Sequence, residues 1–265
     1  MIAHATQRID VLRAARRAAG SLLVGLDFDG TLAPIVPRPA DAALLPAARP
    51  ALEELARRED THIALVSGRS LRDLRARVAL DRVYYAGNHG LEIEGPGVHR
   101  MHEGAGEARG TLSYLARVLH RELAGIDGVI VEDKGLTLSV HFRMVASETQ
   151  EARVRDAVHA QAAGIDGVRL TDGKKVVEIR PDVDWHKGRA FRFIRDTLEE
   201  RFGPGPAIFI GDDRTDEDAF GELGETDCAI VVGDPPQHAT AAQTGLRTPE
   251  EVADFLHRLA RDADA

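Results

Sequence analysis

Residues 22–32 read Leu-Leu-Val-Gly-Leu-Asp-Phe-Asp-Gly-Thr-Leu, so a nearly continuous apolar run ends at a pair of aspartates. Similar apolar runs follow at 63–66, 207–210 and 229–232. Runs without polar alternation are typical of parallel strands that are covered on both faces. Helical patterns lie before, between and after these runs, at 5–19, 47–58, 70–79, 188–202, 215–223 and 249–261. This alternation predicts an α/β fold whose core is a doubly wound, mostly parallel, Rossmann-like sheet.

The composition is that of an ordinary globular protein, with 265 residues, 43% of them apolar and 29% charged. The formal net charge of −9 argues against general nucleic-acid binding, because no overall attraction to a phosphate backbone is available. The single cysteine, Cys228, excludes an intrachain disulfide. No apolar run approaches the roughly 18 residues of a membrane span, and no signal-peptide pattern is visible. We expect a cytoplasmic monomer whose partner is a small molecule, not a nucleic acid or a membrane.

The middle of the chain has a different pattern, which predicts an α/β cap domain at 105–181 inserted into a core formed by 1–104 and 182–265. Helical patterns cover 107–123 and 147–163, and each precedes an apparent strand pair, at 129–142 and 168–180. The first pair bends at Asp133-Lys134-Gly135, and the second is expected to turn at Asp172-Gly173. The sequence Gly-Ile-Asp-Gly-Val at 125–129 recurs at 164–168. Two helix–hairpin units in tandem predict a four-stranded antiparallel sheet with its helices on one face.

The strand pleat sorts the side chains of that sheet. Val177 and Ile179 should face the helices. The opposite face should then carry Lys174, Glu178 and Arg180, with Thr137, Ser139 and His141 from the first pair, and Glu132 and Lys134 if the bend keeps the phase. Such a charged face could be wetted by solvent, or it could form a lid over a polar ligand.

The strongest chemical feature is the pair of carboxylates Asp27 and Asp29 followed by Gly30. In a doubly wound sheet, ligands bind beyond the carboxyl ends of the strands, where these residues would lie. One carboxylate could attack phosphorus, and the second could protonate a leaving oxygen and later activate water. The alternative is a turn with solvent-exposed aspartates.

Three further segments follow strands or begin helices. Ser67 and Gly68 could form an anion site, although Ser67 could equally cap a helix. Lys187 could neutralise a phosphoryl oxygen, and the alternative is a solvated lysine in the first turn of a helix. The acidic segment 211–218 suggests a hard cation such as Mg²⁺. Helix capping would account for its later carboxylates, but poorly for Asp212, which directly follows a strand.

Together these four segments resemble the haloacid dehalogenase-like phosphatase superfamily. The resemblance implies that Asp27 is the nucleophile and Asp29 the general acid/base. It implies that Ser67, with Gly68, and Lys187 bind the phosphoryl group. It also implies that Asp27, the backbone carbonyl of Asp29, and Asp212 hold Mg²⁺. The roles that remain are supporting ones, for Thr31, Asp213 and Asp216.

The spacing of these segments places the cap between the second and third of them, because 120 residues separate Ser67 from Lys187. The segments 33–36, 86–93, 132–135, 141–143, 174–181 and 211–220 resemble the trehalose-6-phosphate phosphatase family. The resemblance implies that Glu132, Lys134 and Glu178 bind the sugar hydroxyls. Further substrate-binding candidates are Arg69, Asn88, His89, His141, Arg143 and Lys174. His186 and Phe142 depart from the family, which more often has Asp and Tyr there.

The implied activity is Mg²⁺-dependent hydrolysis of trehalose 6-phosphate to trehalose and phosphate through an aspartyl-phosphate. Another sugar-phosphate phosphatase of the same fold is an alternative, since it would share the core residues and differ in the cap. A catalytically silent carbohydrate-binding protein is a further alternative, disfavoured because such a protein needs no nucleophile.

Overall fold

The computed structural model describes residues 2–233 and 239–261. The chain forms two compact units. The first comprises Met1–Ile35, Ala42–Arg100 and Trp185–Ala265, and the second comprises Val36–Asp41 and Met101–Asp184. The short segment Val36–Asp41 belongs to the second unit, which the sequence did not indicate.

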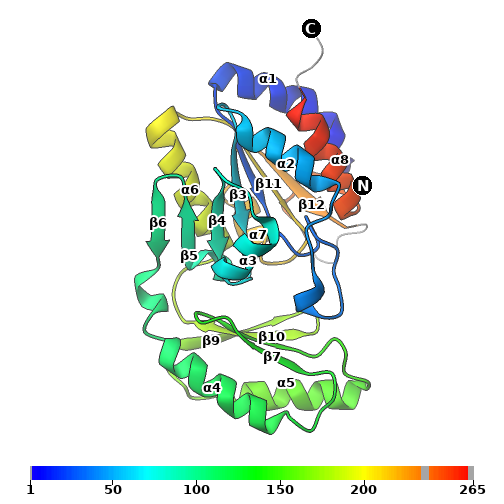
Figure 1. Ribbon diagram of the computed structural model, residues 1–265, viewed down its shortest axis with the longest axis vertical. Coiled ribbons are helices and arrows are strands. Elements are labelled where there is room, and N and C mark those ends of the chain that lie inside the picture. Colours follow the sequence, from blue (N-terminus) through cyan, green and yellow to red (C-terminus); the bar gives the residue numbers. More distant parts are fainter. Residues whose placement is uncertain (1, 234–238, 262–265) are drawn as a thin grey trace. The chain divides into compact units, whose positions relative to one another are not determined.

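The first unit contains a nine-stranded sheet in the order β1-β13-β12-β11-β2-β3-β4-β5-β6. Figure 1 labels β3 to β6, β11 and β12 of this sheet. Neighbours from β1 to β4 run parallel, and β5 is antiparallel to β4. The predicted doubly wound, mostly parallel sheet is therefore confirmed. The strands are β1 (Ala3–His4), β2 (Leu23–Leu26), β3 (His62–Val66), β4 (Tyr84–Gly87), β5 (Glu92–Gly95), β6 (Val98–Met101), β11 (Ala207–Gly211), β12 (Cys228–Val232) and β13 (Thr244–Leu246).

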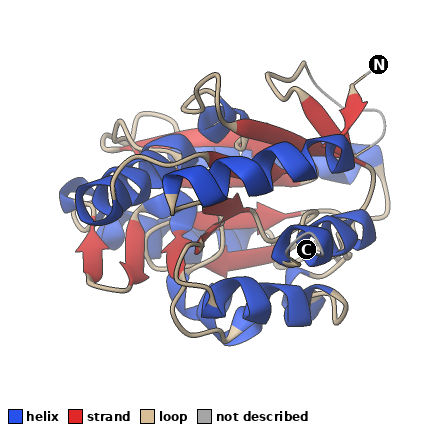
Figure 2. Cartoon of the chain, turned by 90° about the horizontal axis from the view of Figure 1, so that it is seen from above, coloured by secondary structure: helices blue, strands red, loops and turns tan. Residues whose placement is uncertain are grey.

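Helices pack against the strands of this sheet; Figure 2 shows the helices in blue and the strands in red. They are α1 (Ile9–Ala19), α2 (Ala48–Arg57), α3 (Leu71–Val78), α6 (Lys187–Phe202), α7 (Glu217–Phe220) and α8 (Pro249–Ala260), with short 3₁₀ turns η1 (Ala5–Arg8) and η3 (Asn88–Gly90). The helix predicted at 215–223 is shortened to the four residues of α7, since Gly221 follows Phe220 and glycine is a poor helix former.

The core between α6 and the sheet is built around aromatic rings. Phe191 of α6 meets Phe209 of β11 edge to face, with ring centroids 5.1 Å apart. Gly25 of β2 makes this approach possible, because a Cβ there would lie 2.5 Å from both rings. The strand β2, which leads to the two aspartates, therefore packs against α6 and pairs with β11 and β3.

The second unit contains a four-stranded antiparallel sheet in the order β7-β8-β10-β9. Its strands are β7 (Ile130–Asp133), β8 (Leu138–His141), β9 (Val168–Gly173) and β10 (Val176–Pro181), and its helices are α4 (Arg109–Glu122) and α5 (Glu148–Ala162), with 3₁₀ turns η2 (Pro39–Asp41) and η4 (Glu103–Ala105). Val177 and Ile179 are fully buried in one cluster with Leu112 of α4 and Val154 of α5. The predicted antiparallel sheet and the inward face of β10 are confirmed.

The turn predicted at Asp172-Gly173 was wrong by two residues. Gly173 pairs with Val176, so Lys174 and Lys175 form the turn, with Lys175 in the left-handed region (φ 61°). The reason is register, since pairing Val177 with Asp172 and Ile179 with Leu170 keeps the apolar side chains of β10 against the helices.

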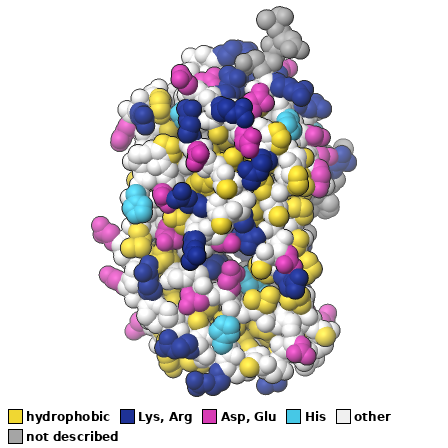
Figure 3. All heavy atoms as spheres, viewed as in Figure 1, with side chains coloured by type: hydrophobic (Ala, Val, Ile, Leu, Met, Phe, Trp, Pro, Cys, Tyr) yellow, Lys and Arg dark blue, Asp and Glu magenta, His cyan; other side chains and the backbone are white. Residues whose placement is uncertain are grey.

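No helix among the described residues is long and apolar enough to cross a membrane. On the face seen in Figure 3, Lys and Arg side chains alternate with Asp and Glu, without an extended area of one charge.

Candidate functional site

Asp27 lies directly after β2, between β11 and β3, and is 4% exposed. Its backbone N–H donates to the carbonyl of Ile210 at 2.9 Å. The loop then turns back, because the N–H of Gly30 donates to the carbonyl of Ala33 at 2.7 Å. Gly30 has a φ of 83°, and a Cβ there would lie 2.1 Å from Asp212 Oδ2. The glycine therefore permits both the turn and the approach of Asp212, and the alternative of exposed turn aspartates fails for Asp27.

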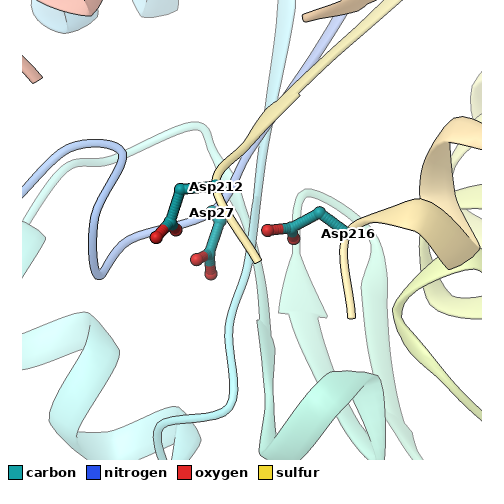
Figure 4. A group of neighbouring side chains, drawn as sticks. All are labelled: Asp27, Asp212 and Asp216. Atoms are coloured by element: carbon teal, nitrogen blue, oxygen red, sulfur yellow. The ribbon is translucent and has the colours of Figure 1, made fainter. Parts of the chain in front are cut away.

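Three carboxylates meet at this edge of the sheet. Asp27, Asp212 and Asp216 each place one oxygen within 4.8 Å of the others, and Figure 4 shows Asp216 directed toward the other two. Asp212 directly follows β11. Asp216 reaches the cluster over Gly211, where a Cβ would lie 2.2 Å from its Cγ. The three residues come from two neighbouring strands and the loop that follows the second.

Lys187 is the first residue of α6 and is only 3% exposed, so it is not a solvated surface lysine. Its Nζ contacts Asp27 Oδ1 at 2.9 Å and Asp216 Oδ1 at 2.8 Å. Burial alone would lower the pKa of Lys187, but the carboxylates of Asp216 and Asp27 raise it above its ordinary value. The lysine is therefore a fixed cation between two of the three carboxylates.

The carboxylates themselves are hard to ionise together. Burial raises the pKa of Asp27 to about 8, against the pull of Lys187 and with further increases from Asp216 and Asp29. Burial, followed by the charges of Asp27 and Asp216, also raises the pKa of Asp212 well above its usual range. The pKa of Asp216 is raised by burial as well. The cluster has more acidic groups than the Lys187 ammonium can neutralise.

These features fit a hard divalent cation. The donors are carboxylate oxygens, which Mg²⁺ prefers. Within the described part of the chain, Asp212 Oδ1 is buried and accepts no hydrogen bond. Thr31 Oγ1, in the neighbouring loop, is likewise buried without a hydrogen-bond partner among those residues. A cation would neutralise the carboxylate charge that the Lys187 ammonium leaves uncompensated.

Asp216 was expected to play a supporting role, and helix capping was its alternative explanation. It does precede α7, but its side chain makes no capping hydrogen bond to that helix. Its Oδ2 instead accepts from the N–H of Asp213 at 2.9 Å, while Oδ1 contacts Lys187. Asp213 itself is exposed and lies outside the cluster.

Asp29 does not contribute its side chain to the cluster. Arg69 holds that carboxylate with two hydrogen bonds, from Nε to Oδ2 and from Nη2 to Oδ1, each 2.7 Å long. The third guanidinium nitrogen, Nη1, donates to Asp73 Oδ2 at 2.6 Å. Arg69 was expected to bind substrate, and the structure shows it holding the predicted acid/base carboxylate. Sequence reasoning missed this pair, because the two residues are 40 positions apart and only their neighbouring strands bring them together.

Ser67 follows β3 and is 1% exposed. It is not a helix cap, since Ser70 caps α3 by accepting from the N–H of Asp73 at 3.2 Å. Ser67 Oγ accepts from the N–H of Arg69 at 3.3 Å. A Cβ at Gly68 would lie 2.8 Å from the ring of His89, so the predicted residues Gly68 and His89 are in contact.

In the second unit, Glu178 lies at the centre of a polar network on the sheet face opposite the helices. Its Oε1 accepts from Lys134 Nζ at 2.6 Å and from Ser139 Oγ at 3.1 Å, and its Oε2 accepts from Arg180 Nε at 2.7 Å. The predicted placement of these four residues on one face is confirmed. Ser139 and Arg180 were not among the predicted site residues.

The other predicted residues of this unit are spread more widely. His141 Nε2 lies 2.9 Å from Glu132 Oε2, so these two separately predicted residues are in contact. Arg143 donates to the carbonyls of Val36 at 2.8 Å and Lys174 at 3.3 Å, so it ties together backbone segments of its own unit. Lys174 lies exposed in the turn between β9 and β10.

Comparisons with known proteins bear on the whole chain. It is 40% identical over 267 residues to the "Trehalose-phosphate phosphatase" of Mycobacterium marinum, covering 97% of this chain and 67% of that protein. It is 42% identical to the "Trehalose-phosphate phosphatase" of Mycobacterium tuberculosis, covering 90% of this chain and 61% of that protein. The chain thus spans about two thirds of these relatives.

A solved structure and a family model extend this likeness. The "C. albicans Trehalose-6-phosphate phosphatase C-terminal domain" superimposes with a TM-score of 0.77 at 21% identity, covering 98% of each chain, which is a likeness of fold. The family model for "Trehalose-phosphatase" matches residues 25–250, from β2 to the start of α8. The predicted resemblance to the trehalose-6-phosphate phosphatase family is confirmed, and the chain belongs to the trehalose-phosphatase family of phosphomonoester hydrolases.

Proposed function

We propose that this protein hydrolyses trehalose 6-phosphate to trehalose and inorganic phosphate, with Mg²⁺ as cofactor and Asp27 as nucleophile. The observation that carries the proposal is the buried contact of Lys187 with Asp27 and Asp216, beside Asp212, in a chain of the trehalose-phosphatase family. This arrangement places a carboxylate nucleophile and a fixed cation at the end of the central strand, where a phosphoryl group would need both.

In the proposed first step, an oxygen of Asp27 forms a bond to phosphorus, and the bond between phosphorus and the sugar oxygen breaks. Asp29 donates a proton to that leaving oxygen, which gives the sugar hydroxyl. In the second step Asp29 takes a proton from water, the water oxygen bonds to phosphorus, and the aspartyl bond breaks to release phosphate. Arg69 would control where the carboxylate of Asp29 can lie during both steps.

Asp27, Asp212 and the backbone carbonyl of Asp29 would hold Mg²⁺, and Asp216 is a further candidate from the cluster. When bound, Mg²⁺ would neutralise phosphoryl and carboxylate charge that otherwise opposes attack by an anionic nucleophile. Ser67, Gly68 and Lys187 would bind the phosphoryl oxygens. Thr31 would support the loop that carries the two aspartates.

The face around Glu178 would recognise the sugar. Carboxylate, ammonium, guanidinium and hydroxyl groups suit a disaccharide, whose hydroxyls both donate and accept hydrogen bonds. Glu132, Lys134 and Glu178 are the proposed sugar ligands, with His141 as a further candidate. For Arg143 the contacts favour a role in holding backbone segments over a direct one. Lys174 stays a candidate for substrate binding. A cytoplasmic location and a monomeric state stay predictions from the sequence.

The test is phosphate release with Mg²⁺ from trehalose 6-phosphate, sucrose 6-phosphate, glucose 6-phosphate and an aryl phosphate. We expect strong preference for trehalose 6-phosphate and no turnover by Asp27→Asn. Glu178→Gln should lower kcat/KM for trehalose 6-phosphate by about 10- to 100-fold, the size expected when a buried charged hydrogen-bonding group is neutralised. It should leave the aryl phosphate nearly unaffected.

Glu151→Gln is the matched control, because Glu151 pairs with Lys175 in the same unit but lies on helix α5. This variant should keep the wild-type kcat/KM for both trehalose 6-phosphate and the aryl phosphate. Preference for another sugar phosphate would keep the core chemistry and overturn the assignment of the sugar. An inactive, folded wild-type protein that binds Mg²⁺ would overturn the proposed activity.

A further inference from the structure

The loop after β4 has an unusual backbone. Asn88 and His89 have φ angles of 49° and 57°, and Gly90 follows with 88°, so three consecutive residues are in the left-handed region. Asn88 is fully buried and His89 is 7% exposed. The left-handed region costs about 1 kcal/mol or more for each residue with a Cβ, and it persists only where surrounding contacts enforce it.

One set of those contacts joins the loop to the segment that follows β3. The N–H of Asn88 donates to the carbonyl of Arg69 at 2.6 Å, and the N–H of His89 donates to the carbonyl of Ser67 at 2.9 Å. The ring of His89 lies against Gly68, where there is no room for a Cβ. The loop therefore contacts all three residues from Ser67 to Arg69.

A second set of contacts joins the same loop to the start of α6. Trp185 Nε1 donates to the carbonyl of Gly90 at 2.7 Å. A Cβ at Gly90 would lie 2.1 Å from the Cβ of Ala190, so α6 packs directly on the loop. The guanidinium of Arg100 lies over the Trp185 ring, 4.2 Å from its centre, and adds a cation–π contact. Trp185 precedes Lys187 by two residues.

We propose that the loop Asn88–Gly90 is a brace that fixes Ser67 relative to Lys187, and that Trp185 is a positioning residue for Lys187. The proposal rests on the proposed function in one respect, namely that Ser67 and Lys187 bind the same phosphoryl group. These two groups come from separate elements, β3 and α6, and small errors in their separation would weaken both contacts at once. The strained backbone lets one short loop reach both elements.

The test is the affinity for inorganic phosphate in the presence of Mg²⁺, measured by titration calorimetry. Trp185→Phe keeps the ring and removes the N–H that donates to Gly90. We expect it to weaken phosphate binding about three- to tenfold, the effect of one hydrogen bond. It should leave the affinity for trehalose unchanged, and it should raise KM for trehalose 6-phosphate and an aryl phosphate by the same factor.

Tyr85→Phe is the matched control. Tyr85 belongs to β4, the strand that precedes the loop, and its hydroxyl donates to the carbonyl of Leu80 at 2.8 Å, outside the brace. This variant should lose a similar amount of stability and keep the affinity for phosphate. Equal weakening by Trp185→Phe and Tyr85→Phe would show general loosening and overturn the proposal, as would unchanged affinity in Trp185→Phe.

A second variant approaches the brace from its other end. His89→Ala removes the ring that packs on Gly68, and it should also weaken phosphate binding without affecting trehalose. Weaker trehalose binding alone would make His89 a sugar ligand and overturn its place in the brace. The calorimetric test does not depend on turnover, so wild-type protein that binds phosphate but hydrolyses no ester would overturn the proposed function and leave the brace intact. Wild-type protein that binds no phosphate would overturn the brace.

Discussion

Asp27→Asn should stabilise the metal-free protein while it abolishes catalysis. The substitution keeps the shape of the side chain and a carbonyl oxygen that can accept from Lys187, which now lies 2.9 Å from Asp27 Oδ1. It removes one negative charge from a buried cluster that contains Asp212 and Asp216. Because burial and neighbouring carboxylates raise the pKa of Asp27 from 3.8 to about 8, the ionised form of this group opposes folding.

The sign and the pH range follow from that pKa. Below pH 3.8 the carboxyl group is protonated in both folded and unfolded chains, and its contribution to stability is fully present. This contribution is lost as the pH rises through about 8. The free energy of unfolding of Asp27→Asn should therefore match that of the wild type near pH 3.8 and exceed it above about pH 8. We expect an excess of a few kcal/mol, because each pH unit over which the folded and unfolded chains differ by one proton contributes about 1.4 kcal/mol.

The assay is urea unfolding in EDTA, followed by tryptophan fluorescence. Trp185 is the only tryptophan of the chain and belongs to the same unit as Asp27, so its emission reports the unfolding of that unit. Asp10→Asn is the control, since that side chain is 92% exposed and its loss should change stability by less than about 0.5 kcal/mol. A stability gain that does not depend on pH, or a loss at high pH, would refute the reasoning.

Three other substitutions probe the same edge of the sheet. Lys187→Met should lower kcat by about 10²–10³-fold and destabilise the metal-free protein by about 3–5 kcal/mol, because the buried carboxylates lose their cation. Steady-state kinetics and denaturant unfolding measure the two effects, and normal turnover would contradict the role of Lys187. Arg69→Lys should lower the free energy of unfolding by about 1–2 kcal/mol and reduce kcat, because an ammonium cannot reproduce the paired hydrogen bonds to Asp29. An unchanged kcat would show that Arg69 does not position the carboxylate of Asp29 for catalysis. Gly30→Ala should weaken Mg²⁺ binding in calorimetry and destabilise the fold by about 1–3 kcal/mol, because the added Cβ would lie 2.1 Å from Asp212 Oδ2. If this variant bound Mg²⁺ as tightly as the wild type, Asp212 would not be a ligand.

Much of the fold was predictable because local pattern and tertiary burial agree. The apolar runs at 63–66, 207–210 and 229–232 became β3, β11 and β12 with almost unchanged limits. The weaker elements were not predictable in this way. β1 has only two residues and exists because Ala3 and His4 pair with the distant residues Thr244 and Gly245. No local pattern encodes such a pairing.

The site residues also fall into those that local pattern could predict and those that depend on tertiary contacts. Asp27, Lys187 and Asp212 were expected to meet because each stands at a strand end or a helix start, and the parallel sheet brings such positions to one edge. The direction of Asp216 was not predictable, because it depends on the missing side chain of Gly211 rather than on capping of α7. In the second unit, strand alternation placed Glu178 with Arg180, and it placed Lys134 with them on the condition that the bend at 133–135 keeps the phase.

The central claim is that phosphate passes through a covalent bond to Asp27. The most direct measurement mixes the Mg²⁺-loaded protein with trehalose 6-phosphate, quenches with acid during the first turnover, and determines the mass of each proteolytic peptide. We predict one added phosphoryl group on the peptide that contains Asp27, and none in Asp27→Asn. Rapid phosphate release without that adduct, or an adduct on another residue, would contradict the account.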